Sequence, residues 1–150
     1  MIQITLYDTQ DSSILDGCFA LAESYENLFS ATLEKSDIWR INHSNGRTVE
    51  VSEDTASLLR TALDYACLTD GKVDPTIMPV SSLWDFGSDA TPHVPGASDI
   101  EEALRHVDYH SIILDGNTVT LTDPKAQIDL GFIAKGYIPV KDNGMIINVP

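Results

Sequence analysis

Apolar and polar residues alternate at the start of the chain and then change period. Ile2, Ile4 and Leu6 fall on one face of residues 2–7, which predicts a half-buried strand. From about 13 to 33, apolar residues recur at steps of three and four, which predicts a long amphipathic helix. The apolar face of that helix is made of Ile14, Cys18, Leu21, Tyr25 and Leu28.

A second helix is predicted from its end signals. Ser52 suits the N-cap, because its hydroxyl can accept from a free backbone N–H of the first turn. Asp70-Gly71 is a stop signal, since glycine readily adopts a positive φ. The predicted buried stripe of this helix is Ala56, Leu59, Leu63 and Ala66. A third, short helix is predicted from Ser98 to about Val107, with Ser98 and Glu101 as a capping box.

The second half of the chain predicts strands. Asp115-Gly116-Asn117 separates two β-type runs, 112–114 and 118–122, and so predicts a hairpin. Residues 128–130 predict a short strand running into Gly131, where a helix begins, and residues 145–149 predict a last strand. The order of elements predicts an α+β fold, an antiparallel sheet with packed helices.

The stretch 72–97 holds four prolines and little periodicity, so it predicts a long ordered loop, a kind of segment that often carries function. On it, Trp84 and Phe86 could stack on a planar ring, with Asp85 beside them, and Gly87 would let a ligand approach the backbone. The alternative is that both aromatics fill the core under the loop.

Residues 129–137 form the most informative segment. A strand that turns into a helix at Gly131 gathers backbone N–H groups, and these favour an anion. Lys135, one turn in, could reach a phosphate oxygen, and Asp129 could accept from a ring or ribose donor. The alternative is a tight strand–helix junction with a surface lysine.

Charge and composition narrow the classes of partner. The formal net charge of −14 argues against nucleic acid and anionic membrane surfaces. No apolar run approaches the ~18 residues of a membrane span, and no signal peptide is visible. Cys18 and Cys67 are predicted to be buried free thiols on helix faces. The four histidines show no metal-ligand spacing.

Five motifs occur in one order, and together they resemble the N-terminal half of the ApbE-type FAD:protein FMN transferases, with a T-fold-like flavin transferase domain. The resemblance covers nearly all of residues 2–137 and would make 1–150 a single FAD-binding domain. The motifs are Ser36-Asp37-x-x-Arg40-Ile41-Asn42, Asp70-Gly71 to Asp74-Pro75-Thr76-Ile77-x-Pro79, Leu83-Trp84-x-Phe86-Gly87, Val107-Asp108-Tyr109 and Asp129-Leu130-Gly131-x-Ile133-Ala134-Lys135-Gly136-Tyr137.

The resemblance implies an enzyme that binds FAD and a magnesium ion, cleaves the pyrophosphate and moves FMN to a threonine or serine hydroxyl of an acceptor flavoprotein. Some relatives hydrolyse FAD to FMN and AMP instead, and a non-catalytic FAD-binding module is a third alternative. Many relatives are periplasmic or membrane-anchored lipoproteins, and a homo-oligomer is left open. The implied FAD contacts are Trp84, Asp85, Phe86, Gly87, Asp129 and Lys135.

Phe132 takes the position where relatives offer a backbone oxygen to the metal, although they usually carry a small residue there. Thr32 stands where relatives often have a tyrosine. After Tyr137 the family continues for more than ~100 residues, on the scale of a further domain layer. Here residues 138–150 instead resemble the family's far C-terminal segment, so the sequence reads as if an interior block and the C-terminal end were absent.

Overall fold

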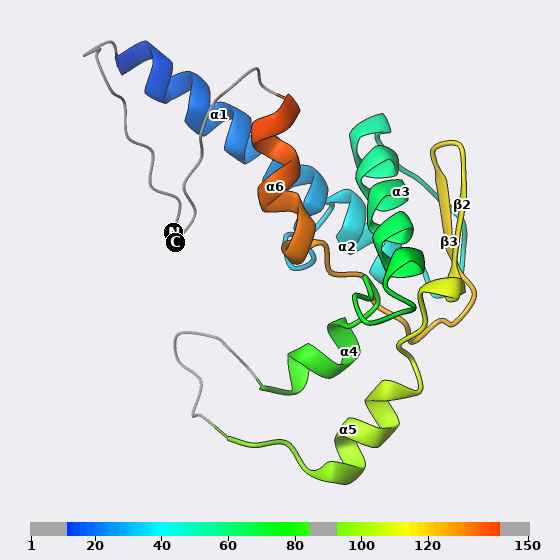
Figure 1. Cartoon of the computed structure of the whole chain (residues 1–150). Helices are drawn as coiled ribbons and strands as arrows, with labels where there is room; N and C mark the ends of the chain where they lie inside the picture. Colours follow the sequence, from blue (N-terminus) through cyan, green and yellow to red (C-terminus); the bar gives the residue numbers. More distant parts are fainter. Residues whose placement is uncertain (1–11, 85–92, 142–150) are drawn as a thin grey trace.

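In the computed structural model, which describes residues 12–84 and 93–141, with side chains to Tyr137, a small antiparallel sheet lies at one side of the helices (Figure 1). The predicted strands at 2–7 and 145–149 lie outside the described residues. The helices are α1 Ser12–Phe29, α2 Asp37–Asn42, α3 Glu53–Leu68, α4 Met78–Ser81, α5 Ala97–Leu104 and α6 Gly131–Lys141, with 3-10 turns η1 Ser82–Trp84 and η2 Tyr109–Ser111. The strands are β1 Val49–Glu50, β2 Ile112–Asp115 and β3 Thr118–Leu121.

The sheet has the order β1-β3-β2, and both pairings are antiparallel. The predicted hairpin forms; Asp115 pairs with Thr118 and extends the first strand by one residue, so the chain turns over two residues instead of three. Gly116 has φ +56°, a conformation that costs a glycine little. The α+β class with an antiparallel sheet is confirmed.

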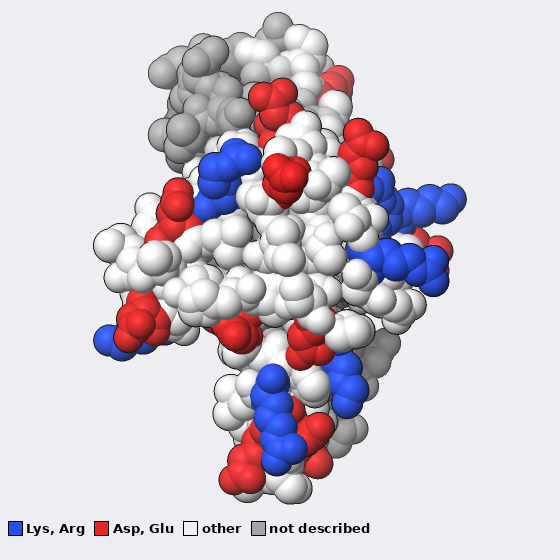
Figure 2. All heavy atoms as spheres, turned by 90° about the vertical axis from the view of Figure 1, so that its right-hand side faces the viewer, with Lys and Arg blue, Asp and Glu red and all other residues white. Residues whose placement is uncertain are grey.

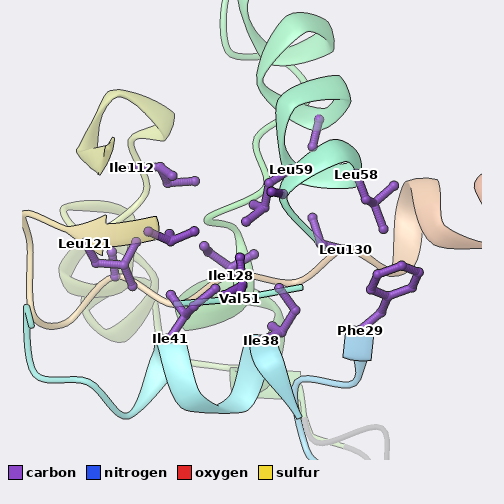
Figure 3. Packing of buried hydrophobic residues seen from close by; sticks show 14 of the residues in the cluster. Phe29, Ile38, Ile41, Val51, Leu58, Leu59, Ile112, Leu121, Ile128 and Leu130 are labelled. Atoms are coloured by element: carbon purple, nitrogen blue, oxygen red, sulfur yellow. The ribbon is translucent and has the colours of Figure 1, made fainter. Parts of the chain in front are cut away.

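The core lies between α2, α3 and the sheet (Figure 3). Ile38 and Ile41 of α2, Leu58 and Leu59 of α3 and Leu121 of β3 are each 2% exposed or less. Burial of this apolar surface is the main stabilising term of the fold. Leu130 and Ile128 enter the same core and so anchor the segment that leads into α6.

The two longer helices follow their sequence signals with small differences. The Ser52 hydroxyl caps α3 by accepting from the Thr55 N–H, and Gly71 donates back to Ala66 at the helix end. α1 stops at Phe29 instead of about residue 33, because the Ser30 hydroxyl accepts from the N–H groups of Thr32 and Leu33 in a local turn.

Three local predictions are wrong. The capping box fails because Ser98 and Glu101 both lie inside α5, whose N-cap is Gly96. Cys67 is exposed and Cys18 is buried; Cys67 sits next to the buried Ala66, one helical step of about 100° away from the core-facing side. Both thiols are free, as predicted.

The strand predicted at 128–130 is also absent. The structure has only a single parallel bridge between Ile77 and Gln127, and the backbone beyond it pairs with a side chain instead of a neighbouring strand. Among the described residues, three short helical segments are additional to the prediction: α2 after the first helix, α4 continuing into η1 inside the expected loop 72–97, and η2 before the hairpin.

Acidic and basic side chains are interspersed on the face seen in Figure 2, and neither sign forms a continuous patch there. Within the described residues, no helix combines the length and apolar character needed to cross a bilayer.

Candidate functional site

The turn from Asp129 to Gly131 opens α6. The Asp129 carboxylate accepts from the Gly131 backbone N–H at 2.8 Å, so it occupies one of the donors at the helix N-terminus. A Cβ on Gly131 would lie 3.1 Å from that same carboxylate oxygen. A side chain at this position would therefore displace the carboxylate slightly, and Asp129 helps to fix the start of the helix.

Two contacts hold this turn from opposite sides. The Asp129 backbone N–H donates to the Pro75 carbonyl at 2.9 Å. On the residue before it, Asn42 accepts from the Ile128 N–H at 2.7 Å and donates to the Ile128 carbonyl at 2.9 Å. The turn is therefore fixed to the 72–78 segment and to the end of α2.

The Asp74-Pro75-Thr76 motif is itself tied down by side-chain hydrogen bonds. Asp74 accepts from the Thr76 N–H and hydroxyl at 2.7 and 2.6 Å, and from the Tyr109 N–H at 3.0 Å. The fully buried Thr76 hydroxyl accepts from the Asp108 N–H at 2.9 Å. The second and fourth sequence motifs thus join in one network under the Asp129 turn.

The outer face of α6 carries two of the predicted site residues. Lys135 is exposed and Phe132 is 47% exposed, while Ile133, Ala134 and Tyr137 pack against the core. Lys135 is therefore free to extend towards a ligand at the start of the helix. The predicted metal contact of Phe132 is a backbone oxygen, which in a helix keeps a second lone pair after its internal hydrogen bond.

Trp84 ends η1 and is half-buried. Its segment begins at Ile77, which pairs with Gln127, and continues through α4, which packs on α5 (Figure 1). The Trp84 segment and the Asp129 turn therefore start from adjoining backbone. Asp85, Phe86 and Gly87 lie outside the described residues, so their FAD contacts stay predictions.

The first motif serves the packing of α2. Ser36 caps α2 by accepting from the Trp39 N–H, and Arg40 lies 3.5 Å from the Asp37 carboxylate while also donating to the Glu50 carbonyl. Arg40 therefore pairs with a carboxylate of its own helix and holds the chain that follows it. Asn42 ends the motif, and its pairing with Ile128 is a contact that the sequence spacing gave no reason to expect.

Two histidines pair with aspartates around a cavity of about 250 Å³ at the base of the hairpin. The Nδ1 atoms of His106 and His110 lie 2.7 Å from the carboxylates of Asp123 and Asp108. Within the described residues, the buried Nε2 of His106 and the Ser111 hydroxyl make no hydrogen bond, although Nε2 lies 3.9 Å from a Glu102 carboxylate oxygen. A water bound at either atom would satisfy it. The cavity is lined by Arg105, His106, Asp108, His110, Ser111, Thr122 and Asp123.

The donor chemistry at the Asp129 turn suits magnesium. Magnesium commonly binds through one or two carboxylates plus substrate phosphates and keeps several waters. Asp129 brings a carboxylate to the turn, and Phe132 a backbone oxygen. Over residues 12–84 and 93–141, no three His, Cys, Asp or Glu side chains gather as an ion-binding group.

These residues define a mixed α+β domain in which a glycine turn opens a helix next to an Asp-Pro-Thr hydrogen-bond network. Comparison with known protein families assigns this domain to one of them. The ApbE family model matches residues 1–140, and the chain belongs to that family.

Two relatives of this chain share the name FAD:protein FMN transferase. The FAD:protein FMN transferase of Klebsiella pneumoniae is 34% identical over 140 residues, and that of Vibrio cholerae is 30% identical over 119. These matches cover 91% and 78% of this chain, but 44% and 36% of the relatives.

Solved structures agree with the fold. The ApbE protein of Thermotoga maritima superposes with a TM-score of 0.79 at 34% identity, over 93% of this chain and 46% of that one. The flavin transferase ApbE of Vibrio cholerae also gives 0.79, at 24% identity, and supports the fold alone. The sequence-based resemblance is therefore confirmed, and the chain spans at most half the length of these relatives.

Proposed function

We propose that this chain is the FAD-binding part of a magnesium-dependent FAD:protein FMN transferase, which moves FMN to a threonine or serine hydroxyl of an acceptor flavoprotein and releases AMP. The observation that carries the proposal is the turn at Asp129, held by Pro75 and Asn42 at the start of α6. Membership of the ApbE family, whose relatives are named for this reaction, supports it.

In the proposed site, Asp129 and Lys135 contact FAD at the start of α6, and Trp84 with Asp85, Phe86 and Gly87 lines the flavin side. Lys135 offers a positive charge to a phosphate oxygen. The dipole of α6, an 11-residue helix, favours negative charge at its N-terminus. These groups work against the repulsion that a chain of net charge −14 exerts on a pyrophosphate.

The chemistry is an attack of the acceptor hydroxyl on the phosphorus that belongs to the FMN half. A new P–O bond forms, the bridging P–O bond breaks, and AMP leaves with the electron pair. The hydroxyl proton passes to a base. When bound, magnesium would neutralise charge on the pyrophosphate oxygens. Asp129 and the Phe132 carbonyl are the proposed protein contacts of that ion.

The test incubates the full chain with FAD and magnesium, with and without an acceptor flavoprotein, and follows AMP by chromatography. A transferase releases AMP together with protein-bound FMN only when the acceptor is present. A pyrophosphatase releases AMP and free FMN without it, and a binding module retains FAD uncleaved. A chain that does not bind FAD contradicts all three functions.

Two further arms test the site. Asp129→Ala is expected to weaken FAD binding at least tenfold, while Asp64→Ala on the exposed side of α3 leaves it unchanged. Unchanged affinity in a folded Asp129→Ala protein would remove Asp129 from the site. EDTA is expected to abolish AMP release, and release that persists in chelator would exclude the metal-dependent mechanism.

A further inference from the structure

The Asn42 side chain bonds like a neighbouring strand to a residue 86 positions away. Its Oδ1 accepts from the Ile128 N–H at 2.7 Å and its Nδ2 donates to the Ile128 carbonyl at 2.9 Å. Asn42 is 8% exposed, so these bonds replace water for two buried backbone groups that have no strand partner.

The same amide also touches the other half of the proposed site. Its Nδ2 lies 3.6 Å from the sulfur of Met78, the first residue of α4. α4 runs into η1, which ends at Trp84. One side chain therefore contacts both the residue before Asp129 and the start of the segment that carries Trp84.

We propose that Asn42 is a positioning residue for FAD binding: it fixes the Asp129 turn relative to the Trp84 segment, without touching FAD itself. The inference rests on the proposed function and adds to it a residue for which the motif suggested no role. Ile128 is held by Asn42, and the next residue, Asp129, is held by Pro75 through its N–H at 2.9 Å. A shift of this turn would move the carboxylate and the first turn of α6 together.

Asparagine is well suited to this position because its amide both donates and accepts, as a peptide group does. An aspartate of the same shape can accept from the Ile128 N–H, but when ionised it cannot donate to the Ile128 carbonyl. An alanine leaves both backbone groups unpaired. The two substitutions therefore remove half or all of the contact.

The experiment compares Asn42→Asp and Asn42→Ala with a control of similar or larger destabilisation, Leu121→Ala. Leu121 is 2% exposed in β3 and belongs to the same core, but it does not bond to the turn. Full-length proteins are titrated with FAD by flavin fluorescence at a temperature well below every melting midpoint. Amide hydrogen exchange at residues 127–131 is measured without FAD.

We expect both Asn42 variants to bind FAD at least tenfold more weakly and the Leu121 variant to bind within twofold of wild type. Exchange at Ile128 and Asp129 is expected to accelerate in the Asn42 variants alone. FAD affinity within twofold of wild type in Asn42→Asp, or unchanged exchange, overturns the positioning role. If Asn42→Ala does not fold, Asn42→Asp decides. A wild-type chain that fails to bind FAD, while exchange still responds to Asn42, overturns the proposed function and this role with it.

Discussion

The Asp37 carboxylate accepts from the Thr55 hydroxyl at 2.7 Å and from the Ser52 N–H at 2.8 Å, and so joins α2 to the N-terminus of α3. Asp37 is 6% exposed and also lies 3.5 Å from Arg40. A buried carboxylate is tolerated when it is paired and hydrogen-bonded in this way. The first sequence motif is therefore a structural joint that places Asn42 at the end of α2.

Asp37→Ala is expected to lower the free energy of unfolding by about 2 to 3 kcal/mol, because it leaves buried donors of Ser52 and Thr55 unpaired. Urea denaturation followed by circular dichroism measures it. Asp64→Ala, on the exposed face of α3, is the control and should change stability by less than about 0.5 kcal/mol. Equal stability of the two variants would contradict the role of Asp37 in joining α2 to α3.

The pairing of Asp123 with His106 predicts a pH-dependent contribution to stability. Burial opposes ionisation of Asp123, but hydrogen bonds from His106 and from the Lys125 N–H outweigh it and hold the pKa of Asp123 below its usual 3.8. A folded-state pKa below the unfolded value gives stability that is present above the unfolded pKa. That stability is lost as the pH falls through the folded pKa.

Asp123→Asn should therefore destabilise the protein by about 1 kcal/mol at pH 7. The difference from wild type should begin to shrink below about pH 4, where this carboxyl takes up a proton in the unfolded chain, and should vanish only when the folded carboxyl is protonated as well. Denaturation midpoints across this pH range measure the effect, with the exposed Asp115→Asn as control. A difference that stays constant down to pH 2 would show that the charge of Asp123 plays no part.

Trp84 is predicted to stack on the flavin, and the chain offers a matched control in its other tryptophan, Trp39. The ring of Trp39 stacks on that of His43, with centroids 4.1 Å apart. Loss of an aromatic contact worth about 1 kcal/mol weakens binding roughly fivefold. Trp84→Ala should therefore bind FAD about fivefold more weakly and Trp39→Ala within twofold. The reverse order of affinities would place the flavin elsewhere.

Lys135 is predicted to act on FAD through charge. Lys135→Ala should weaken FAD binding by about fivefold at low ionic strength, and the loss should diminish in high salt because exposed charges are screened. Fluorescence titration at two salt concentrations measures it, with the exposed Lys125→Ala as control. An effect of Lys135→Ala that is independent of salt would argue for a steric role.

Sequence patterns predicted correctly those elements that contacts between neighbouring residues form. α3 begins directly after Ser52 and ends just before Gly71, close to the predicted ends. The turn at Gly116 forms the predicted hairpin. The capping hydrogen bond and the positive φ depend only on neighbouring residues, so their sequence patterns are reliable. α2 was missed because six residues carry too short a repeat for a helical period to be visible.

The site was less predictable because its contacts are long-range. The residue types at 129–135 indicated an anion-binding turn, and the family motifs added the Trp84 segment. Neither indicated that residues 128 and 129 would bond to Asn42 and Pro75 instead of forming a strand. Such pairings depend on which segments meet after the core has formed.

The 86-residue separation of Asn42 and Ile128 also has a consequence for how the protein folds. Closing so large a loop costs more chain entropy than forming the β2–β3 hairpin, whose partners are neighbours in the sequence. The hairpin and the long helices are therefore expected to form early, and the geometry around Asp129 to be completed among the last steps. A newly made chain would acquire its native-like backbone before it acquires any ability to recognise its ligand.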